Sequence, residues 1–419
     1  MKPRIVIGLA VLLGSTRCVG AQEGRLGLEE LIQEALRKNP EVLAAQKRYE
    51  AARQRPSQEG SLPDPMLSLS YNSSGSPLPF AGIGREPTAN AGLMISQEFP
   101  FPGKRKLRGE IASKEAAAEF EQYQATQLSV ASRLRQAYYR LGYSYAAIEI
   151  LERDRDLLGK LLRVTEARYA VGKAAQQDIF KAQTQLSILE TRIQKMEQEK
   201  RSREAEINSL LGRAAESPLA RPADVLPGPL QLTLGELFAQ ARENAPMLRR
   251  EQKMIERTEL ALNLARKEYY PDYTLSAGYY NMGSMPPMYM ARVDFKLPAY
   301  FWRKQRAGVA EQASSLSQAR HDYEAASQLL GFRIKDDYLM AQTSYRLMKM
   351  YSDTVIPQSS LALQSSLSSY ETGAVDFLSV LMNFTTMLDY ELNYHEEMLS
   401  YLLALARLEE MTGTKLMEN

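Results

Sequence analysis

The chain has 419 residues, and its 52 lysines and arginines nearly balance its 50 aspartates and glutamates, which gives a formal net charge of +2. This balance argues against a nucleic-acid partner, because such binding depends on positive side chains that neutralise phosphates. Cys18 is the only cysteine, which excludes a disulfide framework and a thiolate metal site.

The first 21 residues have the layout of a secretory signal peptide. Lys2 and Arg4 precede a short apolar run, and Val19-Gly20-Ala21 supplies the small residues of a cleavage site. Cys18 offers an alternative, a lipoprotein whose mature chain begins at that cysteine, although the charged Arg17 before it disfavours such processing. No later run approaches the ~20 apolar residues of a membrane helix. Any membrane crossing would therefore be made by β-strands.

The remainder of the chain is a tandem repeat. Segments of the first half recur about two hundred positions later, which favours two copies of one structural unit. The matching segments are 26–31 with 232–237, 62–64 with 270–272, Phe99-Pro100 with Leu297-Pro298, Tyr169 and Gly172 with Tyr370 and Gly373, and Gly212 with Gly413. A proline-rich stretch separates the halves. The sequence therefore predicts a signal peptide (1–21), a first repeat (22–216), a linker (217–231) and a second repeat (232–419).

Each repeat begins with a helical opening, 28–54 in the first, followed by two short strands. Alternating apolar and polar residues predict these strands, at 65–73, 91–99, 272–280 and 289–297. In the last strand Arg292, Asp294 and Lys296 alternate with apolar residues, so we expect them to face the lumen of a barrel. A soluble hairpin packed on a helical body would alternate in the same way.

Two very long helices follow the strands in each repeat, at 104–170 and 173–212 and again at 303–371 and 374–412. Apolar residues step by three and four along them, and Leu141 and Leu189 lie on the predicted buried seams. A helix of this length spans ~100 Å at ~1.5 Å per residue. Such a rod suits a conduit that crosses the periplasm, while a coiled-coil scaffold without a pore is the alternative.

Closure of the strands predicts the stoichiometry. Four strands cannot close a barrel, and open sheet edges are not tolerated in lipid. About eight strands make a barrel filled by its own side chains, so a channel needs more. The expected fold is a mixed α+β membrane protein with two tandem repeats. Three chains would close a trimeric 12-stranded β-barrel and an antiparallel coiled-coil tunnel.

The paired Tyr-x-x-Gly turns, the repeated Leu-x-Leu-x-Glu-Leu helix starts and the twin hairpins resemble the TolC family of outer-membrane factors. The stretch 95–105 (ISQEFPFPGKR) is similar to the heavy-metal CzcC/CusC-like branch. The resemblance implies a homotrimer with a 12-helix periplasmic tunnel in the outer membrane of a Gram-negative-type bacterium. It also implies a periplasmic adaptor (membrane fusion protein) and an inner-membrane RND-type pump as partners. The expected function is a passive exit duct for heavy-metal ions, with drugs or a secreted polypeptide as alternative cargo.

The resemblance also assigns the turns of the long hairpins to the periplasmic tip that docks the adaptor. The residues concerned are Tyr169, Gly172, Tyr370 and Gly373. The candidate gate is Asp178, Asp376, Ser379 and Met382, where the last two stand in place of acids that often line the entrance in the family. The two aspartates could equally be ordinary helix N-caps.

The sequence shows no catalytic constellation, so we expect neither an enzyme nor a bound cofactor. His321 and His395 are the only histidines, and no phosphate-binding glycine loop is present. Met282, Met285, Met288 and Met290 fall in a predicted loop between the second pair of strands. Thioethers can bind Cu(I), but methionine also fills irregular loops. A duct gains little from retaining cargo, so we predict no metal site there.

Overall fold

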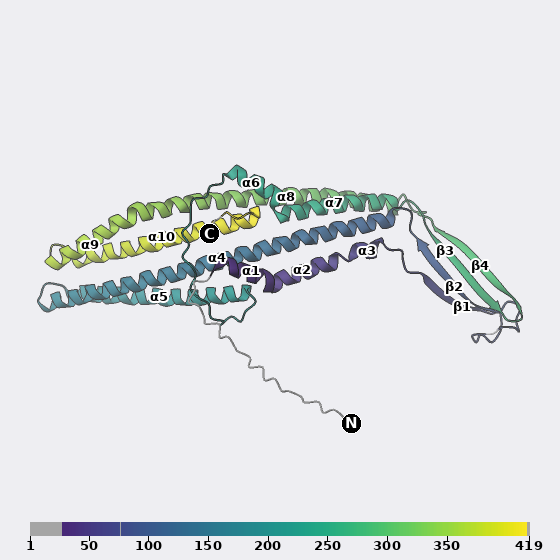
Figure 1. The fold of residues 1–419 in the computed structure, drawn as a ribbon, viewed down its shortest axis with the longest axis horizontal. Coiled ribbons are helices and arrows are strands. Elements are labelled where there is room, and N and C mark those ends of the chain that lie inside the picture. Colours follow the sequence, from purple (N-terminus) through teal and green to yellow (C-terminus); the bar gives the residue numbers. More distant parts are fainter. Residues whose placement is uncertain (1–26, 76, 417–419) are drawn as a thin grey trace, which may run out of the picture.

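The computed structural model describes residues 27–75 and 77–416, which form a long helical rod with a small β-sheet at one end (Figure 1). The turns of two long helical hairpins lie at the other end of the rod. The predicted signal peptide and Cys18 lie outside the described residues.

The opening helix is divided into α1 (Leu28–Lys38) and α2 (Pro40–Ala52), with the short α3 (Arg55–Gly60) after them. Asn39 causes the division, because its side-chain oxygen accepts the backbone N–H of Glu41 at 2.8 Å and so caps α2. Proline follows at the first helical position, where no N–H is needed. The helical opening predicted over 28–54 is therefore present, as two helices that meet at Asn39.

The four strands form one antiparallel sheet in the order β1-β2-β3-β4. Their bounds are Met66–Asn72, Asn90–Phe99, Asp272–Met282 and Met285–Lys296. The central pair joins the two repeats, with Ser96 of β2 opposite Ser276 of β3. β3 and β4 extend farther toward their hairpin turn than the alternation predicts.

One face of the sheet is apolar and exposed. Its large side chains are between 40% and 80% exposed, and they are Leu67, Leu69, Leu93, Ile95, Leu275, Tyr279, Tyr289, Val293 and Phe295. On the opposite face the Ser96 and Ser276 hydroxyls are 3.0 Å apart and buried. The Tyr280 ring covers Gly92 there, where a Cβ atom would lie 2.2 Å from the ring. Only glycine fits beneath this ring.

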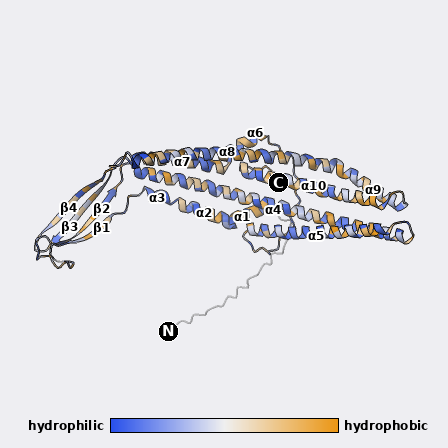
Figure 2. Cartoon of the chain, turned by 180° about the vertical axis from the view of Figure 1, so that it is seen from behind, coloured by the Kyte–Doolittle hydropathy of each residue, from blue (hydrophilic) through white to orange (hydrophobic). Residues whose placement is uncertain are grey.

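The first long hairpin consists of α4 (Lys104–Ala170) and α5 (Gln176–Leu210). α4 is a single helix of 67 residues. Leu141 and Leu189 are fully buried, as their positions on the apolar stripes predict. Orange apolar residues recur between blue polar ones along both hairpins (Figure 2). This mixture is typical of helices with neighbours on more than one side.

The second repeat has a similar order of elements, but its first long helix is broken. Its helices are α6 (Leu234–Asn244), α7 (Pro246–Lys267), α8 (Lys304–Met350), a π-helical turn η1 (Tyr351–Val355), α9 (Ile356–Thr372) and α10 (Phe377–Thr412). The helix predicted to run unbroken over 303–371 is therefore interrupted. The predicted α+β class with two repeats and four strands is confirmed.

The interruption coincides with one extra residue in the second repeat. Tyr138 and Tyr338 are 200 positions apart, whereas Tyr169 and Tyr370 are 201 apart. A π-turn holds one more residue than an α-turn, because its hydrogen bond joins residues five apart. η1 lies between the two pairs of tyrosines, so it accommodates the inserted residue without disturbing the packing on either side.

Proline contributes to the same break. Pro357 has no N–H to donate to the preceding turn, and its ring disfavours the regular helical path. The N–H of Ile356, just before it, donates to the carbonyl of Tyr351 in the five-residue pattern.

Three apolar clusters hold the rod together. One joins α1 and α2 to α4, the end of α5 and α10, and a second joins α6 and α7 to α8 and α10. The third lies toward the turns and includes Leu189, Tyr370 and Phe377. Among the described residues, no helix is long and apolar enough to cross a membrane.

Candidate functional site

The two hairpin turns have the same backbone geometry. Gly172 and Gly373 adopt φ angles of 72° and 86°, a left-handed conformation that costs glycine little. After each glycine, an N–H reaches back five residues to a carbonyl, which is the bond that closes a Schellman-type helix end. These bonds join Lys173 to Arg168 at 2.8 Å and Ala374 to Ser369 at 2.9 Å.

Arg168, beside the first turn, contacts the end of α9 in the second hairpin, and we call this set of contacts the Arg168 clasp. Its guanidinium donates to the carbonyl of Tyr370 and, at 3.2 Å, to that of Glu371. It also lies 4.5 Å from the centre of the Tyr370 ring. A cation at a helix C-terminus is stabilised by the exposed carbonyls and by the helix dipole. The clasp therefore links the two hairpins at their tips.

The two tyrosines of the repeated motif have different environments. Tyr370 is 3% exposed, and its hydroxyl donates to Thr165 at 3.2 Å. Its ring also meets Phe377, edge to face, at 6.0 Å. Tyr169 is 45% exposed. Only the second-repeat tyrosine is thus part of the tip's core, and Tyr169 is available on the surface.

The aspartates of the candidate gate begin their helices. Asp376 caps α10 by accepting the backbone N–H of Ser379 at 3.2 Å. Hydrogen bonding from the side chain and backbone of Ser379 lowers the pKa of the Asp376 carboxyl. Asp178 accepts the N–H of Ala175 at 3.4 Å at the start of α5. Met382 is 60% exposed, one turn beyond Ser379. Within one chain the two aspartates stabilise the starts of their helices. A role for the four residues at an entrance stays a prediction.

Arg292, Asp294 and Lys296 share one face of β4, as the alternation predicts. They lie opposite Ser276, Thr274 and Asp272 of β3. The Arg292 and Asp294 side chains form an ion pair at 2.9 Å. This polar face is opposite the exposed apolar one, so a lumen on this side stays the prediction for these residues.

The methionines do not lie in a loop. Met282 ends β3, and Met285, Met288 and Met290 belong to β4, which leaves only Gly283 and Ser284 as the turn. The prediction failed because Pro286-Pro287 interrupts the alternation, while the strand accommodates both prolines at an edge where pairing shifts register. Among the described residues, no group of three or more His, Cys, Asp or Glu side chains could hold a metal ion.

Sequence reasoning missed the role of Arg168 because its partners are backbone carbonyls of the other repeat. It also missed Lys104, seen only as part of a basic cluster. The Lys104 side chain is 1% exposed, and its Nζ atom contacts Glu268 at 3.1 Å, Asp272 at 2.9 Å and the Tyr270 carbonyl at 3.0 Å. The available signal was that a basic residue recurs 200 positions later, at Lys304, after each strand pair.

Comparisons with known proteins agree with this geometry. A family profile described as "Outer membrane efflux protein" matches residues 31–213 and 237–414. Outer membrane protein TolC of Vibrio cholerae is 21% identical over 411 residues, which cover 92% of this chain and 90% of that protein. The crystal structure of VceC from Vibrio cholerae aligns with a TM-score of 0.80 at 20% identity, covering 93% of this chain and 97% of VceC. The crystal structure of CusC aligns with a TM-score of 0.74 at 18% identity. The alignment covers 92% of this chain and 90% of CusC. At these identities the aligned structures establish the shared fold.

Proposed function

The chain belongs to the outer membrane efflux protein family, and from that premise we propose that it is the passive exit duct of a three-part export system. Family membership places it in the outer membrane with a periplasmic extension, which replaces the alternative of a scaffold without a pore. Three copies form the duct, without enzymatic activity. An RND-type pump supplies energy, and a periplasmic adaptor joins the pump to the hairpin tips.

The main support for a trimer comes from the structure of the β-sheet. β1 and β4 are edge strands, and one face of the sheet exposes a continuous apolar surface. Neither feature is tolerable alone, since open edges are costly in lipid and large apolar patches in water. Joining β4 of one copy to β1 of the next in a ring of three pairs the open edges and gives twelve strands, enough for a water-filled lumen. Insertion of this ring into lipid then covers its outer apolar face.

Mass measurement in detergent and single-channel recording test this proposal together. We expect a trimer that forms stable aqueous pores in planar bilayers. A stable monomer, or a trimer that inserts but conducts under no condition, would contradict the duct.

The hairpin tips supply the gate in this proposal. The Arg168 clasp holds the α9 end against the first hairpin, and η1 lies in the same helix, between α8 and α9. Because π-turns and prolines are where helices bend, we propose that α9 and α10 swing about η1 once the clasp releases. The first hairpin, with α4 unbroken, serves as the fixed wall.

The identity of the cargo is a more specific prediction than the fold and the family. The heavy-metal assignment rests on the stretch 95–105, and drugs or a secreted polypeptide are the alternatives. A host that lacks its own duct distinguishes them, when complemented with this chain and tested for tolerance to metal ions and to organic toxins. Replacing Met282, Met285, Met288 and Met290 with serine should leave tolerance unchanged. A sharp loss of metal tolerance alone would instead indicate a thioether site in the duct.

A further inference from the structure

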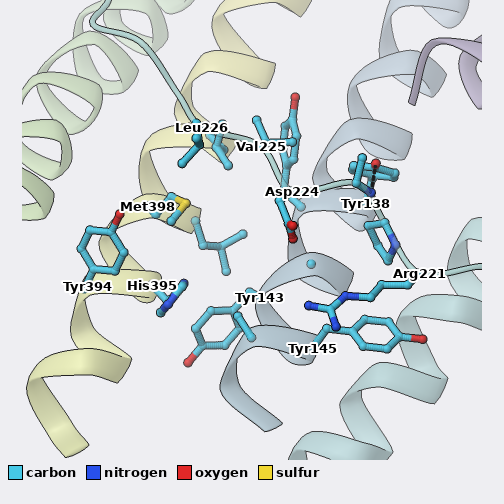
Figure 3. Close-up of a pocket in the computed structure, with 17 residues that line it drawn as sticks. Tyr138, Tyr143, Tyr145, Arg221, Asp224, Val225, Leu226, Tyr394, His395 and Met398 are labelled. Carbon is cyan, nitrogen blue, oxygen red and sulfur yellow. Dashed lines mark hydrogen bonds between the residues drawn. The ribbon is translucent and has the colours of Figure 1, made fainter. Parts of the chain in front are cut away.

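A cavity of about 260 Å³ lies between the middle parts of α4 and α10, away from the hairpin turns and the sheet. α4 forms one wall and α10 another, and the linker segment 221–226 lines a third side (Figure 3). The cavity thus joins the first repeat, the second repeat and the linker between them. Its walls are mainly tyrosine rings and aliphatic side chains.

The hydroxyls of three lining tyrosines are already engaged. Tyr138 accepts the N–H of Ala223 at 2.8 Å, which fastens the linker to α4. The Tyr143 hydroxyl donates to Glu396 at 3.0 Å and that of Tyr145 donates to Glu204 at 3.3 Å. A ligand in the cavity would therefore contact chiefly the ring faces and edges of these three residues.

The cation on the wall is also balanced. Arg221 forms a bidentate pair with Glu149 at 2.5 and 3.1 Å, with its guanidinium 5.5 Å from the Tyr145 ring centre. An anionic ligand would have to compete with this carboxylate. Asp224 places a further carboxylate on the wall, so the electrostatics of the cavity disfavour an anionic ligand.

His395 of α10 lines the cavity, as does Tyr394 of the same helix (Figure 3). Burial lowers the pKa of its imidazole, the positive charge of Arg153 adds to that effect, and Glu149 opposes it. The ring is therefore neutral at physiological pH and presents one N–H and one acceptor nitrogen. A single hydrogen-bonding group is what distinguishes an aromatic alcohol or amide from a plain hydrocarbon.

Gly142 keeps the floor of the cavity open. It lies inside α4, where glycine is a poor helix former, and a Cβ atom there would meet nothing within 4 Å. The same is true of Gly159, farther along α4 and not among the cavity-lining residues. The pair provides one substitution that fills the cavity and another that does not.

We propose that this cavity binds a small uncharged aromatic molecule, stacked between the tyrosine rings and α10 with one polar group directed at His395. Aromatic pairs gain energy beyond burial when stacked or edge to face. The volume is close to the lower end of small-molecule pockets. Bound there, the molecule would hold the two repeats and the linker together. This inference does not depend on the duct or its cargo.

The test measures binding of 2-naphthol to the purified full-length protein in detergent by equilibrium dialysis. We expect saturable binding to the natural protein and to Gly159→Phe, and at least a tenfold loss in Gly142→Phe. The anionic 2-naphthalenesulfonate should bind at least tenfold more weakly than 2-naphthol. Naphthalene, which has no polar group, should bind the natural protein and His395→Leu alike, whereas 2-naphthol should lose affinity in His395→Leu.

Several results would overturn the site. Uptake that rises in proportion to concentration and is equal in all variants shows partition into detergent only. Preference for the sulfonate contradicts the uncharged class. If Gly142→Phe does not assemble, the comparison of 2-naphthol with naphthalene in His395→Leu decides, and equal loss or no loss for both probes refutes the assigned pose.

Discussion

The two long hairpins are copies of one unit, yet each has a feature that the other lacks. The first has an unbroken α4 and supplies Arg168 to the tip. The second has the π-turn η1, and its Tyr370 is buried beneath that arginine. The apolar seam of α4 recurs in α8, where the buried Ile334 and Ala341 match Leu134 and Leu141, while one inserted residue and one arginine distinguish the copies. The shared features therefore hold the rod together, and the unshared ones are those to which we assign the proposed movement.

The largest expected effect tests the shared packing. Leu189 of α5 and Leu388 of α10 are fully or almost fully buried in the same apolar cluster. Leu189→Asp and Leu388→Asp should each prevent assembly, because an unpaired buried charge costs several kcal/mol. Leu141→Asp in α4 should do the same. Trimer yield on native gels is the measurement, with the exposed Thr191→Asp as control.

Normal assembly of any of the three buried variants would contradict the assignment of that leucine to a buried seam. Failure of Leu189→Asp with survival of Leu388→Asp would show that even the packing is unequal between the copies.

Removing the inserted residue makes the second hairpin resemble the first. Deletion of Thr354 with Pro357→Ala should convert η1 into regular α-helix, since proline costs about 3 kcal/mol in a helix interior. The trimer should assemble at normal abundance but open poorly, with export and single-channel current reduced about tenfold or more if opening loses at least about 1.4 kcal/mol. Pro357→Ala alone is the milder control. Full export by the deletion variant would refute the hinge.

Removing the clasp should have the opposite effect. Arg168→Ala loses charge-assisted hydrogen bonds, each of which contributes about 1.5–3 kcal/mol when well shielded. The closed tip should therefore leak, which is measured as raised current without the adaptor and as uptake of large antibiotics by cells. Arg163→Ala, on an exposed position of the same helix, should leave the tip closed. Equal currents in the two variants would show that Arg168 does not restrain the gate.

The turn glycines test how far the tips differ. Gly373→Val should fold and assemble, because left-handed strain costs about 1–3 kcal/mol, but adaptor cross-linking and export should be lost. Its Cβ would also lie 3.3 Å from the Arg168 guanidinium, whereas a Cβ at Gly172 meets nothing within 4 Å. Gly172→Val should therefore be milder. Loss of the trimer in Gly373→Val would make this glycine structural, and unchanged export would move the docking site elsewhere.

The sequence predicts much of this architecture because periodicity is a local signal. Alternation located the strands, and the three-and-four spacing placed Leu141 and Leu189 in the core. The sequence analysis did not predict the interruption at η1, because a single inserted residue in a long helix changes no local pattern. The insertion becomes visible only when the spacing of matching residues is compared between the two repeats. Arg168 and Lys104 escaped for another reason, since their partners lie more than 160 positions away.

The smallest expected effect concerns His395, whose counterpart in the first hairpin, 201 positions earlier, is Gln194. The folded protein lowers the pKa of His395 from its usual value of 6.5, mainly through burial. Protonation therefore favours the unfolded state, so this residue's contribution to stability is fully present above pH 6.5 and declines as the pH falls below it. Thermal melts of the natural protein and of His395→Gln, which copies the first hairpin, should diverge between pH 7.5 and about pH 5, with the variant losing less stability. Parallel melting curves would mean that Glu149 compensates the imidazolium in full. A steeper loss in His395→Gln would mean that protonated His395 stabilises the fold, and the two hairpins would then differ in charge as well as in movement.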